Sequence, residues 1–434
     1  MIRLSLKVGL LAASALIPSL AARSLAAQSL DPAQELRAIF ADPAVHTALR
    51  RLEVEDAETM RTLITLTEIP APPFAEQARG LALRDMLVDA GADSIYVDAV
   101  GNVIALRRGT SGSAGAVAIA GHLDTVFPEG TDVTIRMKGD TLYAPGVGDD
   151  TRGLTAVVAI LRAMNAADIK TEKDILFMGT VGEEGLGDLR GMKHLFRDGG
   201  PSIDSFISID GLRDTGITHQ GLGSHRYLVT FTGPGGHSWG AFGLLNPAHV
   251  MGRATHYFDV AADTYTRSGP KTSYNVGVIS GGTSVNSIPF EASMQVDMRS
   301  LSQERLATID SLFHRAIRRA VTEMNASRRS GPEVTVEIKM IGDRPSGEVA
   351  VDDPLVQRAV AATELFGLEP RLGRSSTDAN VPIALGVPAI TIGGGGSGGG
   401  GHSPGEWFIN QNGPRGIQRA LLILVAQAGL APIS

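Results

Sequence analysis

The hydrophobic and polar positions along the chain change their period several times, and each change predicts a different kind of element. Residues 33–40 and 76–87 carry apolar side chains at helical spacing, so the chain is predicted to be helical up to about residue 98. Short apolar runs typical of buried strands follow at residues 103–106, 116–120, 175–178 and 205–209. A helical stretch, residues 154–164, lies between two of these runs. Alternating buried strands and helices predict an α/β fold with a mainly parallel sheet.

The order of elements changes near residue 224. The pattern then predicts a strand, a helix, two strands, a long amphipathic helix and a last strand, at residues 225–232, 247–260, 274–279, 292–298, 303–325 and 333–340. This βαββαβ order is that of a compact ferredoxin-like unit. Helix and strand patterns resume later, at residues 355–366, 389–392 and 415–429. We therefore predict an inserted domain, residues 224–343, within a discontinuous catalytic domain formed by residues 27–223 and 344–434.

The amino-terminal pattern is that of an export signal. A basic start precedes an apolar run, residues 8–22, and small residues follow it. This arrangement predicts a secretory signal peptide, residues 1–26, that is cleaved after Ala26. An uncleaved membrane anchor is the alternative, but Pro18 and the shortness of the run argue against a permanent span. We expect a periplasmic or secreted protein with no membrane span after cleavage.

Composition narrows the class of partner and of metal site. The chain has 434 residues, a net charge of −7 and no cysteine. Its lysines and arginines are scattered, which argues against a nucleic-acid binder and favours a small or peptidic substrate. Without thiolates, a metal site must use carboxylates and imidazoles, the ligand set of a hydrolytic zinc, cobalt or manganese site.

Acidic residues and histidines of this kind follow the short apolar runs. They lie in the segments Ala-Gly-His122-Leu-Asp124, Gly-Val-Gly-Asp149-Asp150, Val-Gly-Glu183-Glu184-Gly, Ile-Ser-Ile-Asp210-Gly and Gly-Gly-His402-Ser-Pro. In open α/β sheets the ligand crevice lies at the carboxyl ends of the strands. We therefore expect these side chains to meet at one edge of the sheet and to form a metallohydrolase site.

Two of the segments indicate a division of roles. Side chains two residues apart at the end of a strand can point the same way, as those of His122 and Asp124 would. Asp124 can then accept a hydrogen bond from one imidazole nitrogen of His122 while the other nitrogen binds metal. In the pair Glu183-Glu184, one carboxylate can bind metal while its neighbour takes a proton from bound water. The alternatives are an isolated capped histidine and a charged turn, but such groups recur after successive strands.

The run Gly393-Gly-Gly-Gly-Ser-Gly-Gly-Gly-Gly401 is the only low-complexity segment. A flexible linker is one interpretation of such a run. Because the run ends on the candidate ligand His402, we predict a mobile loop at the site.

Together the motifs resemble the co-catalytic di-zinc exopeptidases and deacylases, a family that includes carboxypeptidase G, peptidase T, aminoacylase and succinyl-diaminopimelate desuccinylase. The resemblance covers essentially the whole mature chain, with five motifs in the same order. It implies a mainly parallel-sheet catalytic domain with an inserted ferredoxin-like α+β domain that serves as lid and dimerisation domain, and hence a homodimer. It also implies two divalent metal ions, with Zn²⁺ favoured over Co²⁺ or Mn²⁺.

The resemblance also implies a role for each residue at the centre of the site. Asp149 would bridge both metals and form a cis peptide bond with Asp150. Glu183 would be the general base, and Asp124 the partner of His122. The remaining metal ligands would be His122 and Asp210 at one metal and Glu184 and His402 at the other.

Outside this centre the resemblance points to three further residues. His237, in a Gly-rich segment, would reach the active site of the partner subunit and hydrogen-bond the developing oxyanion. Asn286 and Arg299 would hold the substrate carboxylate or backbone. A structural turn is the alternative for His237, and an ion pair with Asp297 is the alternative for Arg299. The segment Ser376-Thr-Asp378-Ala-Asn380 resembles a loop that lines the pocket.

The substrate rests on a single residue. In this family an aspartate at the position of Asp210 accompanies di- and tripeptidases that need a free amino terminus, which favours aminopeptidase-like action on short peptides. Hydrolysis of an N-acyl or N-carbamoyl amino acid is the alternative. An inactive ligand-binding homologue is a third reading, against which the complete ligand set speaks. The family usually follows its bridging aspartate with Asp or Met, then Lys and Gly, whereas this chain has Asp150-Thr-Arg152-Gly153. This departure leaves Arg152 without an assigned role.

Overall fold

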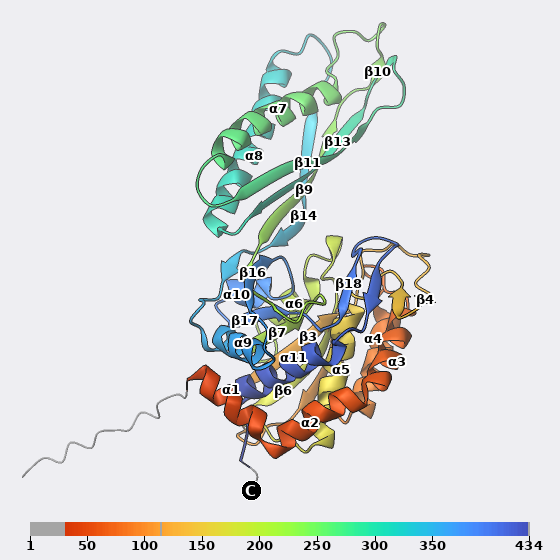
Figure 1. Ribbon diagram of the computed structural model, residues 1–434. Coiled ribbons are helices and arrows are strands. Elements are labelled where there is room, and N and C mark those ends of the chain that lie inside the picture. Colours follow the sequence, from red (N-terminus) through yellow and green to blue (C-terminus); the bar gives the residue numbers. More distant parts are fainter. Residues whose placement is uncertain (1–30, 113–114, 433–434) are drawn as a thin grey trace, which may run out of the picture. The chain divides into compact units, whose positions relative to one another are not determined.

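A computed structural model describes residues 31–112 and 115–432 of the chain (Figure 1). The predicted signal peptide lies outside the described residues. Within them, no helix combines the length and apolar character needed to cross a bilayer.

A central sheet of nine strands organises the fold. Its strands are β1 (Ser94–Val97), β2 (Val103–Arg107), β3 (Ala116–His122), β6 (Asp174–Thr180), β7 (Ile203–Ile209), β8 (Gly216–Gly221), β15 (Gly347–Glu348), β16 (Arg371–Ser375) and β17 (Ala389–Ile392). The order is β1-β2-β6-β3-β7-β17-β8-β15, with β16 paired to β8. The middle strands β6, β3, β7 and β17 run parallel, and antiparallel pairs lie toward both edges. The prediction of an α/β fold with a mainly parallel central sheet is confirmed.

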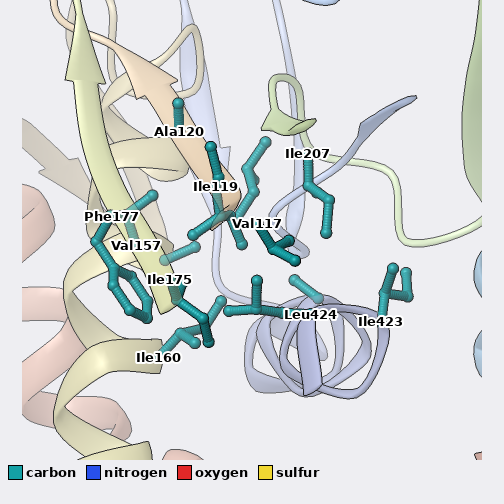
Figure 2. Close-up of a cluster of buried hydrophobic side chains, with 14 of the residues drawn as sticks. Val117, Ile119, Ala120, Val157, Ile160, Ile175, Phe177, Ile207, Ile423 and Leu424 are labelled. Atoms are coloured by element: carbon teal, nitrogen blue, oxygen red, sulfur yellow. The ribbon is translucent and has the colours of Figure 1, made fainter. Parts of the chain in front are cut away.

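Buried helices pack on this sheet. The helices outside residues 223–344 are α1 (Pro32–Ala41), α2 (Pro43–Val54), α3 (Asp56–Thr67), α4 (Gln77–Asp89), α5 (Thr151–Ala166), α6 (Arg190–Leu195), α9 (Pro354–Leu365), α10 (Asn380–Ala384) and α11 (Gly413–Ala428). Helices α5 and α11 contact each other and strands β3 and β7. Figure 2 shows their side chains Ile160 and Leu424 in one cluster with Ile119, Ile175 and Ile207 of the strands. Both helices are apolar on most of their surface, as expected for helices buried against a sheet.

Residues 223–344, here called the ferredoxin-like segment, form a second sheet with its own core. Its elements are β9 (Gly223–Thr232), β10 (Gly236–His237), α7 (Pro247–Thr266), β11 (Thr272–Gly281), β12 (Ser287–Ile288), β13 (Glu291–Ser300), α8 (Gln303–Ala326) and β14 (Thr335–Arg344). The order β11-β13-β9-β14 is antiparallel throughout. Side chains alternate between buried and open positions along β13, and helices α7 and α8 pack on the buried face. The predicted βαββαβ order is present, while the exact domain boundaries stay a prediction.

Several strands differ from the sequence expectation, and β8, β15 and β16 of the central sheet are among those that were not predicted. Strand β1 falls in the part predicted to be helical, and its side chains are mostly exposed, so hydrophobic periodicity gave no strand signal there. A small antiparallel sheet, β18-β19-β5-β4, was also not predicted. Its strands are β4 (Arg136–Lys138), β5 (Thr141–Tyr143), β18 (Ser397–Gly399) and β19 (Trp407–Ile409). Strands of three residues are too short to show alternation.

The packing in Figure 2 leads to a stability prediction. Leu424 on α11 is fully buried, whereas Leu385 is 59% exposed. We expect Leu424→Ala to lower the free energy of unfolding by about 2–5 kcal/mol, because the lost apolar contacts leave a cavity. The matched substitution Leu385→Ala should change it by less than about 0.5 kcal/mol. Urea unfolding followed by circular dichroism measures both, and equal losses would contradict the packing.

Candidate metal centre

Parallel strands deliver the predicted ligands to the same edge of the central sheet. His122 is the last residue of β3, Asp210 directly follows β7, and the pair Glu183-Glu184 follows β6 after a short turn. Asp149 lies two residues before the start of helix α5, which packs on strands β3 and β7. The carboxyl ends of the strands therefore carry the candidate site, as predicted for an open α/β sheet.

Asp149 lies between two histidines that are far apart in sequence. Its Oδ1 is 3.1 Å from His122 Nε2, and its Oδ2 is 3.0 Å from His402 Nε2. His402 Nε2 also lies 3.0 Å from Glu184 Oε1. The peptide bond between Asp149 and Asp150 is cis, as the family resemblance implied. One carboxylate that faces a different imidazole with each oxygen has the arrangement expected of a bridging ligand.

The donor set fits hard or borderline divalent cations. His122, Asp149 and Glu184 each offer one ligand atom, and these atoms lie within 4.8 Å of one another. Asp210 lines the same two cavities as Asp149. Imidazole nitrogen and carboxylate oxygen are ligands that zinc, cobalt and manganese accept. The cluster is therefore compatible with a metal site.

The acids of this cluster repel one another in the absence of cations. Burial, and then the charge of Asp149, raise the pKa of Asp210 well above its usual range. Burial and the charge of Glu183 raise the pKa of Glu184 to about 7. Burial also opposes ionisation of Asp149, but hydrogen bonds with His122 and His402 outweigh it and lower its pKa. Positive charge at this position would relieve the repulsion among all three acids.

Asp150 anchors the first turn of helix α5 beneath the site. It is fully buried, and its carboxylate accepts from the backbone N–H of His122 and of Gly153, both at 3.0 Å. It is the N-cap of α5, where an acceptor satisfies an orphan N–H group of the helix. This contact ties the end of β3 to the start of α5, so the backbones that carry His122 and Asp149 are held together.

Asp124 lies beside His122, but its main-chain oxygen makes the closer contact instead of the predicted carboxylate. The Nδ1 atom of His122 lies 3.0 Å from the main-chain oxygen of Asp124 and 3.7 Å from its carboxylate. The carboxylate instead accepts from the backbone N–H groups of Glu183 at 3.0 Å and Glu184 at 2.8 Å. Asp124 therefore orients His122 mainly through its backbone, and its side chain holds the turn that carries both glutamates.

Glu183 is buried beside an arginine that the sequence did not single out. Arg344, the last residue of β14, places Nη1 at 3.1 Å from Glu183 Oε1 and also donates to the main-chain oxygen of Glu183. The same Nη1 donates to Ser376 Oγ at 3.1 Å. Burial raises the pKa of Glu183, and the charge of Arg344 opposes that rise. The ferredoxin-like segment thus contacts the candidate base directly through Arg344.

Glu406 is a second residue that the sequence did not reveal. Its carboxylate accepts from the backbone N–H groups of Gly146 and Gly148, both at 2.8 Å, and of Asp149 at 3.0 Å. These three bonds fix the turn that presents Asp149. The only available signal was that Glu406 lies four residues after His402, which is too general a spacing to predict this contact.

Arg152 contacts the glycine run, residues 393–401. The side chain is fully buried, and it donates to the main-chain oxygens of Gly394 at 2.9 Å and Gly413 at 2.7 Å. A Cβ atom on Gly395 would lie 2.4 Å from the main-chain oxygen of Gly413, so a larger residue does not fit there. The second half of the run forms strand β18. Residues 393–395 are therefore buried and held by Arg152, whereas residues 396–401 are partly or fully exposed, and the mobility of the run stays a prediction.

The structure does not bring all predicted residues together. Arg299 lines a cavity with Glu183 and also forms the anticipated ion pair with Asp297, at 2.8 Å. His237 is exposed on β10, and Asn286 is exposed beside β12. Neither lines a cavity at the metal cluster among the described residues. The roles implied for His237 and Asn286 stay predictions.

Two cavities meet at the metal cluster, and both include Asp149 and Asp210. The first, here called the arginine cavity, has a volume of about 390 Å³ and is lined also by Glu183, Arg226, Arg299 and Arg344. The second, here called the glycine-strand cavity, has a volume of about 430 Å³ and is lined also by Leu212, Arg213, β18 and Trp407. Asp149 and Asp210 therefore border both cavities.

A model of peptidase family M20/M25/M40 matches residues 118–425, which include every candidate metal ligand. The chain belongs to peptidase family M20/M25/M40. The prediction of a hydrolase of the peptidase and amidohydrolase type is thereby confirmed for this M20 protein, as is the family resemblance inferred from its motifs.

Individual M20 relatives support the same fold. Acetylornithine deacetylase from Myxococcus xanthus is 24% identical over 84% of this chain and 92% of its own length. The crystal structure of aminopeptidase PepT from Bacillus cereus ATCC 10987 matches 88% of this chain and 99% of that one, with a TM-score of 0.67 and 20% identity. The di-peptidase Dug1p from Saccharomyces cerevisiae matches 88% and 98%, with a TM-score of 0.70 and 14% identity.

The contacts of Glu406 lead to a metal-binding prediction. We expect Glu406→Gln to weaken metal binding by about 10–100-fold, because the turn that presents Asp149 loses an acceptor for its N–H groups. Titration of the purified protein against a chromogenic chelator measures this change. Glu129→Gln, at an exposed position, is the matched control and should leave the affinity unchanged. Equal affinities of the two variants would contradict the role of Glu406.

Proposed function

We propose that this M20 protein hydrolyses the amide bond of short peptides, as an aminopeptidase-like di- or tripeptidase, with two divalent metal ions at the cluster and Zn²⁺ favoured. The observation that carries the proposal is the position of Asp149, whose two oxygens face His122 and His402 while Glu183 lies on the same cavity wall. The ligands would be His122, Asp149 and Asp210 at one metal and Asp149, Glu184 and His402 at the other.

When bound, two such cations lower the pKa of a water molecule and polarise the scissile carbonyl group. Glu183 would take the proton of the attacking water and give it to the leaving amine. Its position favours this role, because Glu183 lines the same cavity as Asp149, Asp210 and His402, and a general base must lie within reach of the proton that it accepts. Arg344 would orient Glu183 through its ion pair.

The arginine cavity suits the carboxylate of the leaving half of the substrate. Asp297 lies between two guanidinium groups, 2.9 Å from Arg226 Nε and 2.8 Å from Arg299 Nε. One carboxylate shared by two arginines leaves a surplus positive charge, and a guanidinium fork binds a carboxylate well. We propose that Arg299, next to Arg226, receives the substrate carboxylate.

Two further parts of the proposal concern specificity and assembly. Asp210 favours a peptidase, and the fold likeness to aminopeptidase PepT agrees with this choice. The relation to acetylornithine deacetylase supports hydrolysis of an N-acyl amino acid as the alternative. We also propose export and a homodimer in which His237, with Asn286 beside it, serves the partner subunit's active site, since both residues are exposed in a single chain.

The role of Glu183 is tested by Glu183→Gln. We expect kcat for dipeptides to fall by at least about 1000-fold, because the amide cannot accept the proton of the attacking water. Metal content, measured by mass spectrometry, should stay at the wild-type value because Glu183 is not a ligand. Turnover within tenfold of wild type would remove Glu183 as the base.

The metal and substrate class are tested with one panel. Dialysis against a chelator should abolish hydrolysis of di- and tripeptides, and added Zn²⁺, Co²⁺ or Mn²⁺ should restore it, because activation of the water requires the cations. N-acetyl and N-carbamoyl amino acids, assayed beside the peptides, test the alternative. Faster hydrolysis of these compounds would replace the peptidase assignment, and activity that survives the chelator would contradict the metal site.

A further inference from the structure

The arginine cavity and the glycine-strand cavity differ in their position relative to Glu183. Glu183 lines the arginine cavity and not the glycine-strand cavity. If Glu183 gives its proton to the leaving amine, as proposed above, the amine half of the substrate must lie on the side of Glu183. The acyl half then extends past Asp149 and Asp210, which border both cavities, into the glycine-strand cavity.

Arg213 gives the glycine-strand cavity an uncommitted positive charge. It is exposed, and within the described part of the chain its side chain has no hydrogen bond or ion pair. The adjacent acid cannot neutralise it, because Asp214 is paired with Arg415 at 2.7 Å. A guanidinium without a partner at the wall of a substrate cavity is a ready binding group for a carboxylate.

The other charges of this cavity are already engaged. Both oxygens of Glu406 accept backbone N–H groups, and Asp149 and Asp210 belong to the proposed ligand set. Among the described residues that line this cavity, Arg213 is therefore the charged group that is left to meet a substrate side chain.

The walls of the cavity suit a short side chain with an apolar stem. A Cβ atom on Gly398 would lie 2.3 Å from Leu212 Cδ1, and one on Gly399 would lie 3.1 Å from Trp407 Nε1. Glycine thus lets strand β18 lie directly against these two side chains. A volume of about 430 Å³, with Leu212 and Trp407 on its wall beside Arg213, accommodates a side chain whose methylene groups pack and whose end is charged.

We propose that the glycine-strand cavity binds an acidic side chain, Asp or Glu, on the acyl half of the substrate, and that Arg213 is the residue that selects it. This inference rests on the proposed function and adds the substrate class: short peptides with an acidic amino-terminal residue. Recognition is by the charge of the side chain, so the neutral amides of the same shape are the proper comparison.

The test compares kcat/KM for two pairs of dipeptides in the full-length metal-loaded enzyme. Glu-Ala against Gln-Ala probes the acyl half, and Ala-Glu against Ala-Gln probes the leaving half. We expect the wild type to prefer Glu-Ala over Gln-Ala by at least about tenfold, as charge-assisted hydrogen bonds of a guanidinium provide. In Arg213→Met this ratio should fall to within about twofold, while the ratio for the second pair should change by less than twofold.

Arg136→Met is the matched control. Arg136 is also exposed and lies on β4, the opposite edge strand of the small sheet that contains β18. Its substitution removes the same charge and should keep the tenfold preference for Glu-Ala. A wild type that hydrolyses Glu-Ala and Gln-Ala equally well, or a preference that Arg213→Met leaves intact, would overturn the inference.

A binding measurement separates this inference from the proposed peptidase activity. Calorimetric titration of metal-loaded Glu183→Gln with free glutamate and glutamine needs no turnover. Tighter binding of glutamate that is lost on adding Arg213→Met supports the cavity assignment even if every dipeptide is left uncleaved, in which case only the peptidase function fails. Equal binding of the two amino acids by Glu183→Gln overturns the cavity assignment.

Discussion

The crowding of carboxylates at one edge of the central sheet is the constraint on which the rest of the structure depends. Asp149, Glu184 and Asp210 lie in one cluster, with Asp124 and Asp150 buried beneath them. Buried charges of like sign repel strongly unless hydrogen bonds or opposite charges compensate them. The local fold supplies such compensation by directing backbone N–H groups at Asp124 and Asp150. A cation is the remaining way to balance the acids that face the cavities.

This division of labour separates structural acids from acids that face the cavities. Asp124, Asp150 and Glu406 each accept at least two backbone N–H groups, so each fixes a turn. The oxygens of Asp149 face His122 and His402, and Glu184 Oε1 also faces His402. The structural acids hold the backbone on which the second group depends, so a change in either group is expected to reach the metal site.

Much of the fold was predictable because the hydrophobic positions of its longer elements follow a regular local pattern. The buried strands β3, β6 and β7 are continuous apolar runs, and each is followed by a residue type that marks the crevice. The helices and strands of the ferredoxin-like segment show amphipathic patterns of ordinary length. Strand β1 and the three-residue strands of the small sheet lack such patterns, so sequence reasoning missed them or assigned the wrong element.

The site was predictable in its residues but not in its contacts. His122 and Asp149 could be chosen because their residue types and motifs are distinctive. Arg344 and Glu406 act through contacts with residues 161 and more than 250 positions away, and no local pattern encodes such pairs. The same holds for Asp124, where spacing suggested a bond to an imidazole but the nearby N–H groups of another loop compete for its carboxylate.

The clamp formed by Arg152 has a consequence for how this scaffold can change over time. Arg152 lies in the first turn of α5, next to the turn that carries Asp149. Its hydrogen bonds to the main-chain oxygens of Gly394 and Gly413 join that turn to two segments near the carboxyl terminus. Because Arg152 joins these three segments, we expect few amino-acid substitutions to be tolerated in them. Divergence toward new substrates is therefore expected at cavity residues outside these contacts, such as Arg213, whose side chain has no hydrogen bond or ion pair within the described part of the chain.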